Sequence, residues 1–181
     1  MWCSPRSEGA PDSVRPALPS GSATTSNVAP KRAAESATEM VQVVLPNDAN
    51  PLGFILGGTV MHLIDIAGAI AGHRHTRSPL VTAAVDDLQF LHPIKVGDLI
   101  ILKARVTCVF TTSLEVQVDV YSEATLTGER CLTSRAFLTF VTVKKDGVRS
   151  TIPPLVIETD EERRAREEAC ARRAQRLARR V

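Results

Sequence analysis

An acidic residue stands in the middle of an apolar stretch of small side chains. Asp65 lies between Ile64 and Ile66, inside the run that extends from Gly57 to Gly72. A carboxylate is costly to bury unless another group pairs with it or a reaction uses it. In a pocket it could act as a general base, or attack an electrophilic carbonyl directly as a nucleophile. The alternative is a structural carboxylate that caps a turn or pairs with a basic residue across an interface.

Two features upstream of Asp65 supply hydrogen-bond donors that could face the same substrate. Gly57 and Gly58 open the apolar stretch, and the first turn of a helix there would have unpaired N–H groups able to polarise a carbonyl and hold an oxyanion. Glycine lets a substrate come close to this backbone, although glycines also precede helices for purely conformational reasons. Asn50 adds an amide side chain, and an equally good interpretation makes it a turn residue before Pro51.

The spacing of apolar residues predicts the elements that must position these groups. Helical spacing runs from about Thr59 to Gly72, and this helix is apolar nearly all round, which predicts that it is buried. A short strand over Val41–Leu45 precedes it, and four antiparallel strands follow, the last over Arg130–Lys144. The predicted fold class is therefore α+β, with one central helix against a curved antiparallel sheet of about five strands.

The first strand after the helix carries an irregularity. Val81, Ala83 and Val85 alternate as inward-pointing residues, and the phase then slips at Asp86-Asp87, which predicts a β-bulge. We interpret these two aspartates as solvated or salt-bridged rather than catalytic. A later strand shows the clearest half-buried pattern, in which apolar residues alternate with polar ones: Leu114, Val116, Val118 and Val120 with Glu115, Gln117 and Asp119.

Composition argues against several classes of function. The chain has 181 residues and a formal charge of +2, which is too small to indicate nucleic acid or an anionic membrane as a partner. No apolar stretch is long and charge-free enough for membrane insertion. The four cysteines lack C-x-x-C spacing, which is typical of a reduced, cytoplasmic protein without a disulfide framework or zinc site. His73 and His75 have the wrong spacing for two ligands on one helical face, so we expect no metal.

The distribution of residue types predicts three segments. Residues 1–39 are rich in proline, serine and alanine and poor in large aliphatic residues, which predicts a disordered, flexible N-terminal extension. Residues 40–154 carry the patterned domain, and Met40 stands where the pattern begins, so we consider it an alternative translation start. Residues 155–181 carry a charged helix with a thin apolar face, whose interleaved arginines and glutamates favour a solvated or oligomer-contacting face over nucleic-acid binding.

Several motifs, taken in order, resemble the hotdog-fold acyl-CoA thioesterases. The resemblance is carried by the run Asn50–Met61 together with Asp65, by Val81–Asp86, and by the turn Val96-Gly97-Asp98. Residues 112–116 and 136–141 fit the same family. The most similar subgroup contains the bacterial YciA-type enzymes and the brain-type cytosolic acyl-CoA hydrolases. The resemblance covers about residues 40–154 and leaves both tails outside it.

This resemblance implies a fold, an assembly and a site. In the hotdog fold an antiparallel sheet wraps round one helix, two domains pair to extend the sheet, and the subgroup commonly forms a trimer of dimers. The resemblance implies that Asp65 and Asn50 act together across the interface of a homodimer, with the Gly57-Gly58 backbone, and Gly58 above all, donating to the thioester carbonyl. The implied activity is hydrolysis of acyl-CoA to free fatty acid and CoA, with coenzyme A as part of substrate and product and no other cofactor.

Expectations about the substrate, and two alternatives, accompany this interpretation. Phe54 and Leu56 differ from the residues that many relatives carry, and we expect them to make the acyl pocket more apolar. One alternative function is a non-catalytic acyl-CoA sensor with the same fold. The other is a hotdog enoyl-CoA hydratase or dehydratase, which would need a catalytic histidine facing the pocket, and His62 and His92 lack the surrounding motif. On charge alone, the candidates for contacts with the CoA phosphates are Lys95, Lys144, Lys145 and Arg149.

Overall fold

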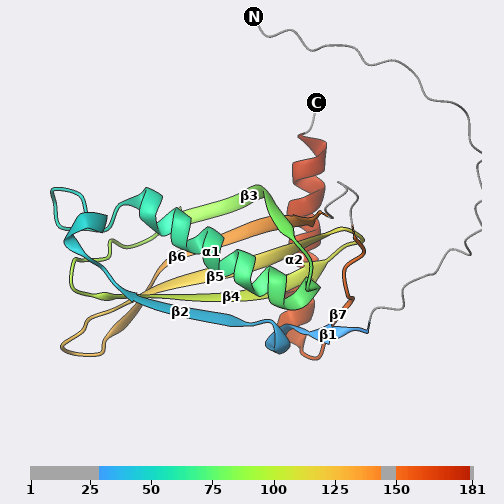
Figure 1. Ribbon diagram of the computed structural model, residues 1–181, viewed down its shortest axis with the longest axis horizontal. Coiled ribbons are helices and arrows are strands. Elements are labelled where there is room, and N and C mark those ends of the chain that lie inside the picture. The colour runs from blue at the N-terminus through green and yellow to red at the C-terminus, as the bar shows by residue number, and fades with distance from the viewer. Residues whose placement is uncertain (1–28, 144–149, 180–181) are drawn as a thin grey trace, which may run out of the picture.

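A long helix lies across one face of a five-stranded antiparallel sheet (Figure 1). The computed structural model describes residues 29–143 and 150–179. Helix α1 is Gly57–Thr76, and the strands follow the order β2-β4-β5-β6-β3 across the sheet. Their bounds are Thr38–Val43 for β2, Leu80–Phe90 for β3, Leu99–Val109 for β4, Ser113–Glu123 for β5 and Arg130–Thr142 for β6. This architecture confirms the predicted α+β arrangement of one central helix against five antiparallel strands.

The core forms where the small residues of α1 meet the sheet. Ala67 and Ala71 are fully buried. A Cβ atom built on Gly68 would lie 3.1 Å from the ring of Phe140 in β6, closer than ordinary van der Waals contact. Helix and sheet therefore approach each other at a distance that only small side chains permit. The helix extends beyond the predicted Thr59–Gly72 at both ends and finishes at Arg77, which adopts the left-handed conformation of a C-cap.

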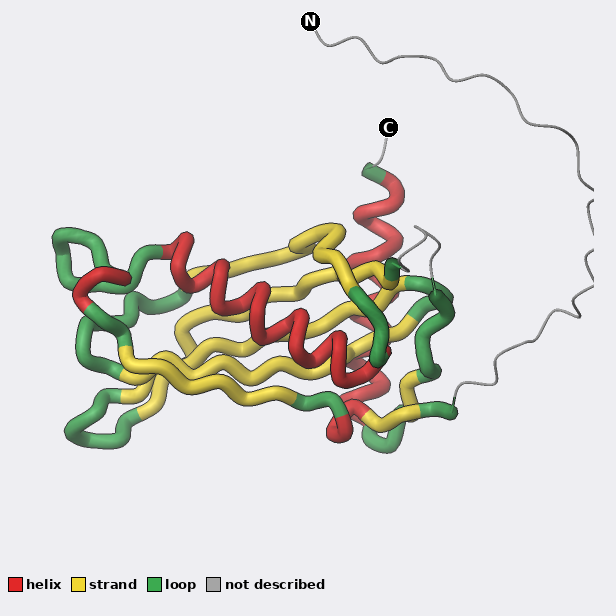
Figure 2. Tube along the Cα trace, viewed as in Figure 1, coloured by secondary structure: helices red, strands yellow, loops and turns green. Residues whose placement is uncertain are grey.

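One face of α1 is open in the single chain, in contrast to the burial predicted for it. Met61 on this face is 47% exposed, and His62 beside it is also exposed. Figure 2 shows the reason, because the sheet covers the helix from one side only. An apolar face of this kind indicates a surface that another subunit can cover.

Folded elements begin earlier than the predicted domain boundary at residue 40. The two-residue strand β1 (Lys31–Arg32) pairs in parallel with β7 (Leu155–Val156), and the short 3-10 helices η1 (Ala33–Glu35) and η2 (Pro46–Asp48) flank β2. Lys31 Nζ donates to the carbonyl of His75 at 2.8 Å, and Ser36 is fully buried. Residues 29–39 are thus part of the domain, because side-chain and backbone hydrogen bonds order them without large aliphatic residues. A chain starting at Met40 would lack these contacts. Residues 1–28 lie outside the described residues.

Strand β3 forms one edge of the sheet and contains two bulges. Its register against β6 shifts between Val85 and Asp87, which confirms the bulge predicted at the aspartate pair. A second shift, between Thr82 and Ala84, was not predicted. The three residues predicted to point inward, Val81, Ala83 and Val85, are all exposed. The second bulge gave no sequence signal because it falls at Ala83 and Ala84, whose small side chains blur the contrast between faces.

Helix α2 (Asp160–Ala178) packs on the opposite face of the sheet from α1 (Figure 1). Its Arg172 forms a two-pronged ion pair with Glu115 of β5, with N–O distances of 2.8 and 3.0 Å. Glu115 is only 2% exposed and Gln117 only 5%. The prediction of a half-buried strand is therefore wrong for β5, since the charged helix returns to cover the polar face.

The buried His75 ties α1 to the segment that leads into β7. Its Nε2 donates to the carbonyl of Pro153 at 3.0 Å, while its buried Nδ1 forms no hydrogen bond with any described residue. Burial lowers the pKa of His75 below its ordinary value of 6.5.

This lowered pKa predicts a loss of stability in mild acid. Below pH 6.5 this histidine is protonated in the unfolded chain but stays neutral in the folded chain. The free energy of unfolding should therefore decrease as the pH is lowered from 6.5 to the folded-state pKa. In His75→Gln, which keeps a donor for Pro153 but does not titrate, this part of the pH dependence should be absent. Urea unfolding of both proteins between pH 5 and pH 8 measures the difference. Parallel pH profiles would contradict the prediction.

Candidate active site

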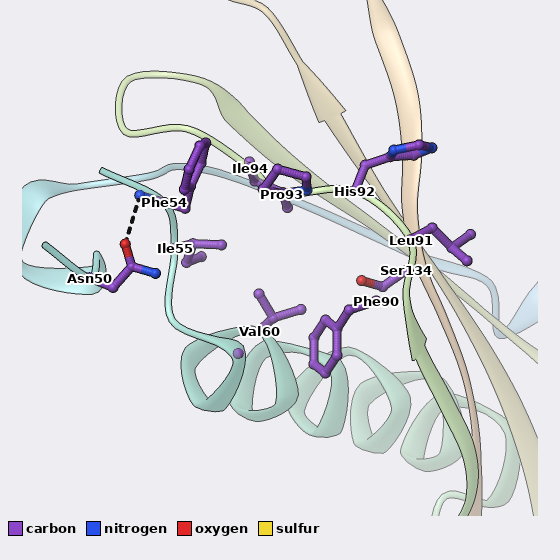
Figure 3. A pocket seen from close by; sticks show the side chains of 11 residues that line it. Asn50, Phe54, Ile55, Val60, Phe90, Leu91, His92, Pro93, Ile94 and Ser134 are labelled. Carbon is purple, nitrogen blue, oxygen red and sulfur yellow. Dashed lines mark hydrogen bonds between the residues drawn. The ribbon is translucent and has the colours of Figure 1, made fainter. Parts of the chain in front are cut away.

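A pocket of about 300 Å³ opens beside the beginning of α1. Figure 3 shows that it lies between the loop that carries Asn50, the first turn of the helix and the segment that follows β3. Its walls are mostly apolar, with the Asn50 side chain at one side. The lining residues are Asn50, Phe54, Ile55, Gly57, Val60, Phe90, Leu91, His92, Pro93, Ile94 and Ser134.

Asn50 is both a turn residue and a candidate substrate contact. Its Oδ1 accepts hydrogen bonds from the backbone N–H groups of Leu52 at 3.0 Å and Phe54 at 3.2 Å, which fixes the turn. Both bonds use the oxygen, and the Nδ2 group makes no hydrogen bond to any residue that the structure describes. The side chain is thus held rigidly with a donor to spare for a ligand.

The Gly57-Gly58 pair forms the first two residues of α1, just before the predicted start at Thr59. No side chain caps this helix within the described part of the chain, so the N–H groups of its first turn keep their hydrogen-bonding capacity. A Cβ atom on Gly58 would meet nothing within 4 Å, which leaves the approach to this backbone open. The positive end of the helix dipole adds to the attraction for an oxyanion.

Asp65 is half-buried and hydrogen-bonded to a threonine of β3 that the sequence pattern did not indicate. Thr82 Oγ1 in β3 donates to Asp65 Oδ1 at 2.6 Å. Among residues 29–143 and 150–179, no cation lies within ion-pair distance of Asp65, which argues against a structural ion pair inside the chain. Nothing in the sequence indicated a role for Thr82, because polar residues are common in edge strands. Only the folded structure places its hydroxyl next to Asp65 of α1.

Within one chain, the Asp65 carboxylate lies outside the pocket that contains Asn50. Asp65 is eight residues after Gly57, which corresponds to about 12 Å along the helix axis. Two half-sites therefore exist: an acid held by Thr82 on the open face of α1, and amide donors at the start of the same helix.

The remaining candidate residues have less to do with the pocket. Lys95 is exposed and comes directly after Ile94, which lines the pocket; its backbone forms an isolated β-bridge with Phe54. Leu56 is also exposed, and it does not line the pocket. His92 lines it, but Figure 3 shows its ring directed away from Asn50. Lys144, Lys145 and Arg149 lie outside the described residues.

Among residues 29–143 and 150–179, no three His, Cys, Asp or Glu side chains are grouped so that they could hold a metal ion. Neither α1 nor α2 combines the length and the apolar character needed to cross a membrane.

Comparisons with known proteins agree on one family. The sequence-family model described as Thioesterase superfamily matches residues 52–129 of this chain. The chain is 41% identical over 128 residues to the uncharacterized acyl-CoA thioester hydrolase YkhA of Bacillus subtilis, covering 71% of this chain and 74% of that protein. It is 31% identical to the cytosolic acyl coenzyme A thioester hydrolase of Mus musculus, covering 85% of this chain but only 41% of the mouse protein.

Solved structures extend the similarity to the fold. An apo-hexameric acyl-CoA thioesterase superposes with a TM-score of 0.80 at 39% identity, over 84% of this chain and 97% of that one. The acyl-CoA hydrolase of Staphylococcus aureus, solved with butyryl-CoA, CoA and CoA disulfide, gives a TM-score of 0.77 at 33% identity, over 83% and 92% of the two chains. Three alanine variants of that hydrolase were also solved. They replace an aspartate, an asparagine 15 positions before it and a threonine 17 positions after it.

Proposed function

The chain belongs to the hotdog-fold acyl-CoA thioesterases, and we propose that it hydrolyses acyl-CoA to a free fatty acid and CoA at a site shared by two subunits. The observation that carries the proposal is the separation of Asp65 with Thr82 from the pocket of Asn50 and Gly57. Each half lacks what the other supplies, so a second copy of the chain completes the site.

The surface around Asp65 suits a twofold dimer. Strand β3 is an edge of the sheet, and its Val81 and Val85 are 51% and 47% exposed. Met61 of α1, one turn before Asp65, is 47% exposed. An exposed apolar edge strand is avoided in a monomer, because its unpaired backbone groups invite pairing. Pairing of β3 with its symmetry mate would extend the sheet and lay two α1 helices side by side. The hexameric relative supports a further association into a trimer of dimers.

In this proposal Asp65 acts as base or nucleophile, and the Asn50 amide and the Gly57-Gly58 backbone act as hydrogen-bond donors. Asp65 takes a proton from water that attacks the thioester carbonyl, or attacks that carbon itself, while Thr82 holds Oδ1 and leaves the other oxygen free. Asn50 Nδ2 of the neighbouring subunit orients the water or the substrate. The Gly58 N–H, with Gly57 beside it, stabilises the negative charge that develops on the carbonyl oxygen. The C–S bond then breaks, and CoA leaves as its thiolate, which takes up a proton.

The spacing of the three polar residues supports these roles. Asp65 follows Asn50 by 15 positions and precedes Thr82 by 17 positions. The Staphylococcus aureus variants show the same order, residue types and separations. The cytosolic relative from mouse supports a cytoplasmic location. Lys95, which follows Ile94 of the pocket wall, remains our proposed contact for the CoA phosphates.

A panel of acyl-CoA substrates tests the activity. We expect release of free CoA thiol from at least one acyl chain length, measured with a chromogenic thiol reagent. Tight binding of acyl-CoA without thiol release would favour the sensor, and hydration of an enoyl-CoA would favour the hydratase. Either outcome would overturn the proposal.

Subunit mixing tests whether the site is shared. Asp65→Asn and Asn50→Ala should each be nearly inactive alone, but a hybrid dimer of the two contains one site with both changes and one site with neither. Unfolding the two variants together and refolding them should therefore recover about a quarter of wild-type activity, since half of randomly formed dimers are hybrids with one intact site. No recovery, with hybrids detected by mass spectrometry, would show that both residues serve one subunit.

A further inference from the structure

Two thiols face each other across the contact between α2 and the sheet. Cys108 in β4 and Cys170 in α2 have their sulfur atoms 4.0 Å apart, although 62 positions separate them in the sequence. Cys108 is buried, with 1% of its surface exposed, whereas Cys170 is exposed. Neither residue belongs to the proposed active site, which lies on the other side of the sheet (Figure 1).

The contacts around Cys170 hold this arrangement in place. Ala169, the preceding residue, is fully buried against the sheet. Arg172, two positions later, pairs with Glu115 and stacks on Phe137 with its guanidinium carbon 3.6 Å from the ring centroid. Because the helix is fixed on both sides of Cys170, its thiol stays near Cys108 at a high effective concentration.

We propose that Cys108 and Cys170 are an intramolecular disulfide site that low-molecular-weight disulfides, such as glutathione disulfide, oxidise reversibly. The exposed Cys170 thiolate attacks glutathione disulfide, forms a mixed disulfide and releases one glutathione. Cys108 then loses its proton and attacks the Cys170 sulfur, which expels the second glutathione. Two protein thiols are oxidised and one glutathione disulfide is reduced to two glutathione molecules. The two sulfur atoms must close from 4.0 Å to about 2.05 Å.

The environment of the pair sets the order of these steps. Burial raises the pKa of the Cys108 thiol to about 12, so this residue reacts poorly with reagents from solution. It meets an electrophilic sulfur only after Cys170 has been converted to the mixed disulfide beside it. Formation of the bond would tie α2 covalently to β4, and we expect the oxidised protein to unfold at a higher urea concentration.

The experiment uses the full chain with Cys3→Ser and Cys131→Ser, which leaves only the pair. After incubation with glutathione disulfide, the intact mass should fall by two hydrogen atoms, and dithiothreitol should restore it. Cys108→Ala in this background should instead gain the mass of one glutathione at Cys170. In the wild-type chain the four cysteines fall in different tryptic peptides, 1–6, 106–130, 131–135 and 167–172. The expected cross-link joins 106–130 to 167–172.

Two results would overturn the proposal. One is a stable glutathione adduct on Cys170 while Cys108 is present, since this would show that the buried thiol does not reach its neighbour. The other is an unchanged mass after oxidation, with both thiols still reactive when the protein is unfolded. Neither result bears on acyl-CoA hydrolysis, because these measurements do not use catalytic activity.

Discussion

Asp65→Asn should lower kcat for acyl-CoA hydrolysis by about 10²–10⁴-fold, the usual contribution of a positioned general base. Asparagine has nearly the same shape, and its carbonyl oxygen can still accept the hydrogen bond that Thr82 donates at 2.6 Å. What it lacks is the basic, nucleophilic carboxylate oxygen. Thiol release under saturating substrate measures kcat, and size-exclusion chromatography with circular dichroism checks that assembly and fold are unchanged.

The matched control for this prediction is Asp160→Asn. Asp160 lies at the start of α2, on the other face of the sheet, and its side chain is 89% exposed. We expect this variant to keep the wild-type kcat within about threefold, since a surface charge outside the site adds little to the barrier. If Asp65→Asn retained full activity, or if both variants lost activity equally, Asp65 would not be the catalytic base or nucleophile.

The second large effect concerns stability rather than turnover. Arg172→Ala should lower the free energy of unfolding by about 3 kcal/mol, because it leaves a buried carboxylate without its counter-charge. Glu115 is 2% exposed, and its remaining partner is Thr107 Oγ1, which donates at 2.7 Å. Loss of the Arg172 stack on Phe137 adds to the destabilisation. Urea unfolding at neutral pH and a fixed protein concentration measures the change.

Two further variants identify the cause of that loss. Glu115→Leu combined with Arg172→Met should regain most of the stability, since two apolar side chains of similar size remove the unpaired charge. Arg163→Ala removes a cation of the same helix whose side chain is 64% exposed, and it should change stability by less than about 0.5 kcal/mol. A loss below about 1 kcal/mol in Arg172→Ala would mean that the ion pair is effectively solvated.

Sequence reasoning recovered the parts of this protein that depend on local pattern. The five strands, the central helix and the bulge at Asp86 follow from hydrophobic periodicity, which reports the face of each element. Asp65 and Asn50 were noticed because a carboxylate among isoleucines and an amide before a glycine pair are unusual in composition. The edges of these elements were less predictable, since the order of residues 29–39 depends on hydrogen bonds to distant parts of the chain.

The sequence by itself determined which residues of this protein carry chemistry, whereas their partners were decided by tertiary structure. Thr82 reaches Asp65 because the fold brings β3 beside α1, at a position next to a bulge that was not predicted. The sequence pattern placed Glu115 on the solvent-facing side of its strand, but α2 covers that side in the folded protein. The same packing of α2 on the sheet places Cys170 next to Cys108. The physical reason is that periodicity records whether a side chain faces an apolar or polar environment. It does not record which distant group will lie there.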